Sequence, residues 1–218
     1  MESSHALPDI YQLRIVLKGI SPLIWRRLLV RRATTLAQLH HILQLLFDWS
    51  GEHLHEFHLY GKNHGDNGAD TRDVRLSDFR LHSGERFRYV YDFGAYWQCD
   101  IRLEGSLPVD AKRYYPVCIS GKGAAPPEHC CSPWAYMEMM DEYRSPPLDA
   151  MLVAAEAVRA VLEADPQSSI REAIDDMEAL REAVERLRDY HEFEPDKINR
   201  RRINTQLRAH AQLVGGGP

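Results

Sequence analysis

The sequence is poor in the features that mark secreted, zinc-finger or membrane proteins. Its four cysteines form no C-x-x-C pair, and the adjacent Cys130 and Cys131 have poor geometry for a mutual disulfide, so we expect reduced thiols. No apolar run is long enough to span a bilayer, and the first residues lack a basic segment followed by an apolar one. We therefore expect a cytoplasmic protein with no membrane segment and no secretory signal.

Positive charge is also scarce. The 218 residues carry a formal net charge of −5, which argues against broad electrostatic attraction to nucleic acid and leaves only a local basic patch. One such patch is formed at the end of a predicted edge strand by Arg26, Arg27, Arg31 and Arg32. Arginines at such a place are more typical of solvated side chains that block edge pairing. Nucleic-acid binding is therefore an alternative and not the leading hypothesis.

Alternation of apolar and polar residues predicts most of a sheet. Period two indicates strands over residues 11–18, 23–30, 53–60, 86–93 and 97–103. Gly94-Ala95 between the last two suits a two-residue type II′ turn, and their shared polar face would carry Asp92, Gln98, Asp100 and Arg102. Segments 61–73 and 107–133, rich in Gly, Asn or Pro, are predicted as loops.

Helical spacing takes over elsewhere. Thr35 and Gln38 match a capping box, which predicts a helix over 36–47 that packs on the sheet. The C-terminal part shifts to Ala, Glu and Arg and predicts helices over 134–143, 148–162, 170–187 and 197–213. The second and third of these are expected to pair as an antiparallel hairpin, and a homodimer through the C-terminal helices is the alternative.

Histidines are concentrated in one stretch. Six of the eleven lie between His40 and His64, which raises the question of a metal. His53 and His55, two apart on a strand, can point at one ion, but a site needs further ligands. The candidates to complete it are His40, Asp92 and Asp100. Because His-x-His pairs are common without a metal, we assign no metal and no cofactor and expect a hydrogen-bonding role.

Polar residues that interrupt otherwise apolar elements define the candidate binding site. Its residues are His53, His55, Asp92, Trp97, Asp100 and Glu128. We expect at least one of the two histidines to lie within direct or water-bridged reach of Asp92 or Glu128, lining a concave surface with Trp97 at its edge. The alternative is that these groups tie the Pro-Pro-Glu loop to the sheet and leave no cavity.

Several separated motifs together carry a family resemblance. They are Ser21-Pro22-Leu23-Ile24-Trp25-Arg26-Arg27, Thr35-Leu36-Ala37-Gln38-Leu39-His40, Trp49 with His53-Leu54-His55-Glu56-Phe57, Tyr91-Asp92-Phe93-Gly94 with Trp97, Pro126-Pro127-Glu128, and Asn204 with Leu207. In this order they strongly resemble the plasmid ORF-three-like family, named for an open reading frame on a root-inducing plasmid. Members of that family are also described as TnpR-like passenger proteins of an insertion sequence.

The resemblance implies a division of the chain and some departures from the family pattern. It covers about residues 8 to 145 and resumes near 190, so we interpret 8–144 as the core, 145–190 as a helical hairpin insertion and 191–214 as a helix that returns to the core. Ala95 stands for a second aspartate, Gln98 lies near the usual histidine, and His129 replaces an aspartate. A family site built on those residues would lack two potential ligands.

The expected fold is α+β, with a β-grasp-like mixed sheet, one packed helix and a mostly helical C-terminal part. The leading functional hypothesis is a non-enzymatic binding or accessory protein of mobile-element ancestry, with an unknown ligand or protein partner. The alternative from another class is a metal-dependent hydrolase or nuclease that uses His53, His55, Asp92, Asp100 and Glu128. A resolvase activity is not supported. A serine recombinase needs a nucleophilic serine backed by several arginines, and Ser21 near Arg26 and Arg27 matches this only loosely.

Overall fold

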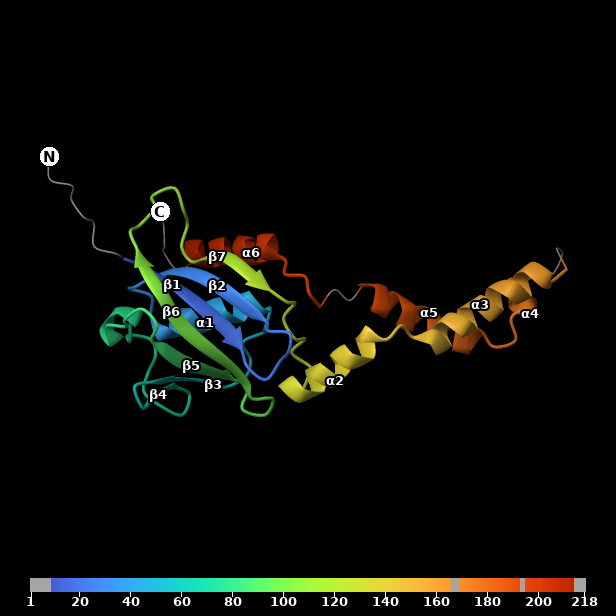
Figure 1. The fold of residues 1–218 in the computed structure, drawn as a ribbon, viewed down its shortest axis with the longest axis horizontal. Helices are drawn as coiled ribbons and strands as arrows, with labels where there is room; N and C mark the ends of the chain where they lie inside the picture. Colours follow the sequence, from blue (N-terminus) through green and yellow to red (C-terminus); the bar gives the residue numbers. More distant parts are fainter. Residues whose placement is uncertain (1–8, 166–168, 193–194, 214–218) are drawn as a thin grey trace. The chain divides into compact units, whose positions relative to one another are not determined.

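The computed structural model describes residues 9–165, 169–192 and 195–213, and an antiparallel sheet of seven strands forms the centre of its larger unit (Figure 1). The strand order is β4-β3-β5-β6-β1-β2-β7. The strands are β1 Ile10–Leu17, β2 Trp25–Arg31, β3 His55–Leu59, β4 Lys62–Gly65, β5 Arg86–Tyr91, β6 Trp97–Leu107 and β7 Val117–Lys122. A short 3-10 helix, η1 Leu76–Phe79, precedes β5.

The α+β class is confirmed, but the expected mixed pairing is not what the sheet shows. Every ladder between the named strands is antiparallel. The connections from β1 to β2, β3 to β4 and β5 to β6 are short, and a short connection can only join antiparallel neighbours. The sheet therefore grows from three hairpins rather than from crossover units.

Two strands lie in segments that the sequence predicts as loops. β4 has only four residues, Lys62–Gly65, and β7 has one fully buried side chain, that of Cys118. Neither carries the apolar alternation by which a strand is recognised in a sequence. Because β7 pairs with β2, β2 is an interior strand, and the prediction that its arginines end an edge strand is wrong.

The connection between β5 and β6 is longer than the predicted two-residue turn. Tyr91 pairs with Trp97, which leaves five residues, 92–96, in the loop. Asp92 leaves the strand with φ 54°, and its Oδ1 accepts hydrogen bonds from the backbone N–H of Gly94 at 2.9 Å and of Ala95 at 3.2 Å. The carboxylate thus shapes the loop, as Asp side chains commonly do in turns.

Helix α1, Leu36–Phe47, covers one face of the sheet, which we call the core face (Figure 1). The predicted capping box is present: Gln38 N donates to Thr35 Oγ1 at 3.2 Å, and Thr35 N donates to Gln38 Oε1 at 3.0 Å. The helix ends at Asp48, whose φ is 55°, and not at Gly51. Apolar side chains of α1 meet those of the sheet in the core, among them Leu39, Leu43, Leu13, Ile15, Phe57, Ile101 and Leu103.

Helix α6, Arg200–Leu213, lies along the edge strand β7 (Figure 1). It begins three residues later than predicted, because the side chain of Asn199 accepts a hydrogen bond from Arg202 N at 3.0 Å and caps the helix. The amide of Asn204 accepts from Cys118 N at 2.8 Å and donates to Cys118 O at 2.9 Å. Asn204 therefore satisfies main-chain groups of β7 that no further strand pairs.

The smaller unit comprises residues 138–194 and is helical. Its helices are α3 Leu148–Glu163, α4 Ile170–Ala173 and α5 Met177–Glu192, and α2 Pro133–Arg144 crosses the boundary between the units. Within the smaller unit α3 and α5 pack antiparallel, as predicted, and Nη1 and Nη2 of Arg186 donate to the Asp149 carboxylate at 2.6 and 3.2 Å. The reading of 145–190 as an insertion and the homodimer stay predictions.

The helix predicted over 170–187 is in fact two helices. Ile174 is extended, with φ −111° and ψ 115°, and ends α4. Asp176 then caps α5 by accepting hydrogen bonds from the N–H groups of Glu178 and Ala179. Its carboxylate competes with continuation of the first helix, which the heptad-like spacing does not reveal. No helix of the described chain combines the length and apolar character needed to cross a bilayer.

Candidate functional site

Glu128, in the loop after β7, accepts hydrogen bonds from Ser50, which follows α1, and from Tyr91 of β5. Its Oε2 accepts from Ser50 N at 2.9 Å, and its Oε1 accepts from Ser50 Oγ at 2.9 Å and from the hydroxyl of Tyr91. That hydroxyl also accepts from Gly51 N at 3.1 Å. Ser50, Gly51, Tyr91 and Glu128, which we call the Glu128 tie, thus join the Pro-Pro-Glu loop to α1 and β5.

The electrostatics of the tie favour a charged carboxylate beside a neutral phenol. Burial alone would raise the pKa of Glu128, but hydrogen bonds from Tyr91 and Ser50 outweigh it and bring the pKa below its usual value. Burial, followed by the hydrogen bond to Glu128, raises the pKa of Tyr91. Donor and acceptor roles are therefore fixed, and Tyr91 donates to Glu128.

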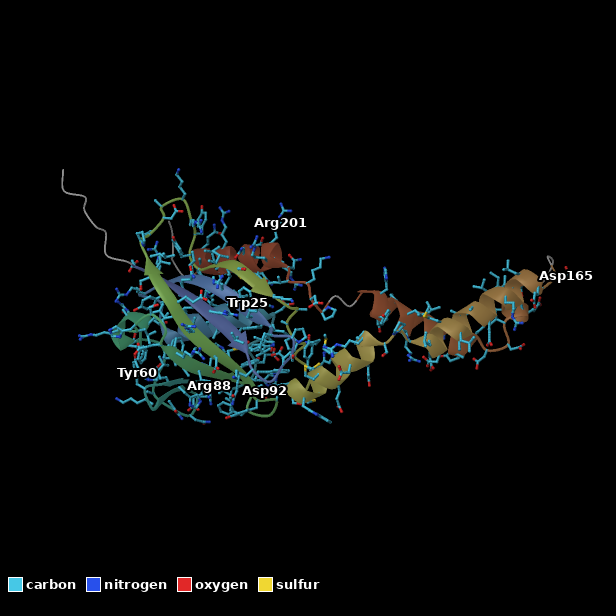
Figure 2. The ribbon with its side chains drawn as sticks, in the orientation of Figure 1. Trp25, Tyr60, Arg88, Asp92, Asp165 and Arg201 are labelled. Carbon is cyan, nitrogen blue, oxygen red and sulfur yellow. The ribbon has the colours of Figure 1, made fainter. Side chains whose placement is uncertain are left out.

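His53 and Asp92 lie beside the tie. His53 Nε2 is 3.9 Å from Asp92 Oδ2, and the imidazole meets the Tyr91 ring edge-on at 5.7 Å between centroids. One of the two predicted histidines is therefore at a distance from Asp92 that a single water can bridge. Asp92 is labelled in Figure 2 at the end of β5. Its other carboxylate oxygen, Oδ1, accepts the hydrogen bonds from the β5–β6 loop.

His55 lies apart from these groups and stacks on His40 of α1. The two ring centroids are 3.7 Å apart with 20° between the planes. His55 Nδ1 is 3.0 Å from Asp66 Oδ2, and its backbone N–H donates to the same oxygen at 2.7 Å. His40 Nδ1 is 2.7 Å from the hydroxyl of Tyr89. This stacked pair joins α1, β3, β5 and the loop after β4.

The hydrogen bonds of the stacked pair favour one tautomer of each imidazole. Gln44 Nε2 donates to Tyr89 Oη at 2.7 Å, so the phenolic proton is left to donate to His40 Nδ1, and the His40 hydrogen lies on Nε2. The Asp66 carboxylate only accepts, so His55 carries its hydrogen on Nδ1. Burial lowers the pKa of His40 to about 3 and also lowers that of His55. Both imidazoles are therefore neutral at pH 7.

His55 Nε2 is thus a bare acceptor next to a His–Asp pair, the arrangement in which a general base is oriented. The atom is buried, however, and has no hydrogen-bond partner among the described residues. A substrate therefore has no direct access to this nitrogen. The pair consequently fixes the packing of α1 on the sheet more readily than it transfers protons.

Two candidate site residues lie elsewhere. Trp97 is 0% exposed in the core, so the prediction that it edges a concave surface is wrong. Asp100 points to the opposite face of the sheet, where it pairs with Lys18 at 3.4 Å and Arg88 at 3.9 Å. Trp97 and Asp100 are three residues apart on one strand and so cannot share a face, which separates Asp100 from His53 and His55.

The proposed metal-dependent chemistry has no matching ligand set in the described part of the chain. Among those residues no group of three or more His, Cys, Asp or Glu side chains is arranged to hold an ion. The candidate ligands are divided among the Glu128 tie, the stacked pair and the opposite face. The arginine hypothesis also needs correction: Arg26 points into the core, and Arg27 is bound by Glu104 at 2.6 and 2.9 Å.

The sequence does not single out Tyr89, Gln44, Asp66 or Ser50, although each completes one of these networks. The alternating pattern predicts that Tyr89 is buried, but it does not predict the partner of its hydroxyl group, because Gln44 lies on a helix 45 residues away in sequence. Asp66 lies in a segment predicted as a loop. Only three-dimensional pairing makes these residues neighbours.

The protein is of the α+β class. Its antiparallel sheet is covered on one face by a capped helix, and a glutamate holds a proline-containing loop against them. The model of the plasmid pRiA4b ORF-3-like protein family matches residues 9–168, most of the chain, and the protein belongs to that family.

The names of similar proteins state no activity. The uncharacterised protein y4hQ of Sinorhizobium fredii is 30% identical over 146 residues, which cover 63% of this chain and 75% of that protein. The crystal structure of MM3350, a protein of unknown function from Methanosarcina mazei, is 30% identical with a TM-score of 0.64, covering 88% of this chain and 96% of that one.

Proposed function

We propose that the protein is a cytoplasmic, non-enzymatic binding module of mobile-element ancestry that recognises an acidic protein partner through the face of the sheet opposite α1, here called the open face. Four arginines in one row carry this proposal. Arg27 of β2 is paired with Arg14 of β1, Arg14 with Arg102 of β6, and Arg102 with Arg86 of β5. Four neighbouring strands thus present cations directly opposite one another.

Such a row is unfavourable in the isolated protein. Like charges directly opposite on a sheet are destabilising, and strands lie about 4.8 Å apart, so the four cations extend over about 14 Å. Arg27 is compensated by Glu104, whereas Arg14, Arg86 and Arg102 make no salt bridge in the described part of the chain. An arrangement that repels itself is best accounted for by a partner that supplies the missing negative charge.

The surroundings of the row favour a protein over a nucleic acid. Trp25, which Figure 2 labels over the sheet together with Arg88, has the guanidinium groups of Arg14 and Arg27 5.0 and 5.4 Å from its ring centre. Its ring is therefore already occupied by cations and is poorly placed to stack on bases. The row is also short, and the chain as a whole is acidic, which disfavours a long polyanion.

The residues of the predicted site also support a binding module rather than an enzyme. Apart from His55 Nε2, the polar groups described in the Glu128 tie and in the stacked pair have partners within their own cluster, as expected of groups that hold loops to a sheet. That arrangement supports a rigid platform for recognition rather than a reaction centre. None of the four cysteines forms a disulfide, and three of them are buried, which supports a reducing compartment.

The test uses a poly-glutamate peptide and, in parallel, a single-stranded oligonucleotide, titrated into the full chain at low salt. The informative variant is Arg86→Ser with Arg102→Ser, both exposed. Its control is Arg159→Ser with Arg201→Ser, which removes the same charge from α3 and α6. We expect the row variant to bind the peptide about tenfold more weakly and the control to bind within about twofold of the parent.

Two results would overturn the proposal. Equal losses in the two variants would show that only net charge matters and that the row is no site. Oligonucleotide binding that depends on Arg86 and Arg102, without peptide binding, would assign the open face to nucleic acid instead.

A further inference from the structure

A concave feature lies between the end of α1, the loop 124–127 and the start of α6. It is a cavity of about 360 Å³. Its walls are mostly apolar, with Phe47, Pro126, Ile198 and Ile203 among them, and the buried Arg26 also lines it. A volume of this size lies at the lower end of the range of small-molecule sites.

Arg26 is the unusual member of this lining. It is only 1% exposed, although it is a cation, and it makes no salt bridge within the described residues. Its Nε donates to Leu46 O at 3.1 Å, and its Nη1 donates to Trp25 O at 2.9 Å and to Lys122 O at 3.1 Å. Its Nη2, with two further N–H groups, has no hydrogen-bond partner among the described residues.

Part of this arrangement is structural. The three carbonyl contacts bind the C-terminal end of α1 to β2 and β7, where the helix dipole favours a cation. Gly121 leaves room for it: a Cβ at that position would come within 3.1 Å of Arg26 Cδ and 2.6 Å of Ile198 Cδ1. Those contacts, together with the Phe47 ring 5.2 Å from the guanidinium carbon, hold the group in place and account for Nε and Nη1, whereas Nη2 makes no hydrogen bond within the described residues.

The charge around the cavity favours an anion. Besides Arg26 the lining contains Lys197 and Arg202, and its one carboxylate, Asp48, is bound by Arg202 at 3.1 Å. The start of α6, capped by Asn199, also lies on this lining, and helix starts attract negative charge. A rigid buried cation with free N–H groups in an apolar cavity is costly unless an oxyanion completes it.

We propose that this cavity binds a small organic monocarboxylate, whose carboxylate accepts from Nη2 of Arg26 and whose apolar body lies against Phe47, Pro126 and Ile198. A single negative charge suits one uncompensated guanidinium, and the apolar walls reward a hydrocarbon body over a bare ion. The site shares no residue with the arginine row of the open face. The inference therefore stands independently of the proposed function.

The experiment titrates sodium benzoate, sodium acetate and inorganic phosphate into the full chain by calorimetry, with thermal unfolding as a second readout. We expect benzoate to bind saturably, more tightly than acetate or phosphate, and to raise the unfolding temperature. Ala125→Phe, in the cavity lining, should fill the cavity and weaken benzoate binding about tenfold or more. Ala155→Phe on the exposed face of α3 is the matched control and should leave binding unchanged.

Arg26→Lys tests the headgroup contact directly, because lysine keeps the charge but has no Nη2. If this variant folds, it should bind benzoate about tenfold more weakly. If it does not fold, the Ala125→Phe and Ala155→Phe pair decides alone. Three results would each overturn the proposal: no saturable binding of benzoate, equal benzoate binding by Ala125→Phe and Ala155→Phe, or tighter binding of phosphate than of benzoate.

Discussion

The two faces of the sheet are made by the same strands, yet they treat polar groups in opposite ways. On the core face the polar groups of the Glu128 tie and of the stacked pair are neutral or paired: His40 stacks on His55, and Tyr91 donates to Glu128. On the open face three arginines, at positions 14, 86 and 102, make no salt bridge within the described residues, although the charge of Arg14 also acts on Glu104. Charge that a fold tolerates without compensation marks a surface kept for something other than stability.

The strongest test of this difference replaces the same residue type on each face. Trp97→Ala removes a 0% exposed side chain of the core face and should cost about 3–5 kcal/mol of unfolding free energy. Trp25→Ala on the open face removes a half-buried ring and should cost less than half as much. Denaturant titration measures both, and similar losses would mean that the two faces are packed alike.

Glu128→Ala examines whether the tie is structural. The change leaves Tyr91 Oη and Ser50 N without their acceptor, so we expect a loss of about 1–3 kcal/mol. Glu138→Ala, which removes an exposed carboxylate from α2, is the control and should change stability little. A stable Glu128→Ala variant would favour the alternative that Glu128 belongs to a ligand site.

The stacked histidine pair predicts a pH dependence. Because the folded pKa of His40 is about 3, below the unfolded value near 6.5, the unfolded state binds more protons between these values. The contribution is complete above pH 6.5 and is lost as the pH falls, by about 1.4 kcal/mol on going from pH 7.5 to pH 5.5.

The check is the unfolding free energy at both pH values. His40→Gln should remove about this much of the slope, whereas His58→Gln on the open face should leave that part of it in place. A His40→Gln variant with the parental slope would show that folding does not lower the pKa of His40.

The smallest expected effect is a gain. Arg102→Thr removes one member of the arginine row and should stabilise the protein by about 0.2–1 kcal/mol, more at low salt. The matched change is Arg88→Thr, because Arg88 is paired with Asp100 across the same two strands and its loss should not stabilise. Stabilisation by both changes, or by neither, would contradict the idea that the row repels itself.

Local rules in the sequence predicted some elements well. The Thr35–Gln38 capping box placed the start of α1, and alternation placed β5 and β6 and their buried sides. Both rules depend on residues within a few positions of each other, so a sequence carries them in full. The proximity of His53 to Asp92 was also within reach, because each lies at an end of a predicted strand.

The rest depends on partners that are distant in the chain. Arg26 looks like a solvated arginine until β7 closes over β2 and the end of α1 supplies carbonyls. The arginine row cannot be predicted from the sequence, because the register between two strands does not follow from the residues of either strand alone. The β5–β6 turn failed for a different reason, since the Asp92 side chain competes with the backbone for the N–H groups of the loop.

The contact between Asn204 and Cys118 has a consequence for how copies of the chain meet. An exposed edge strand offers its main-chain groups as a template for another molecule, the usual route to strand-swapped dimers and fibres. At β7 the amide of Asn204 occupies both such groups of Cys118, and at the opposite end β4 is only four residues long. The sheet is therefore a poor seed for growth at either end, and concentrated solutions of the protein should resist aggregation by strand addition.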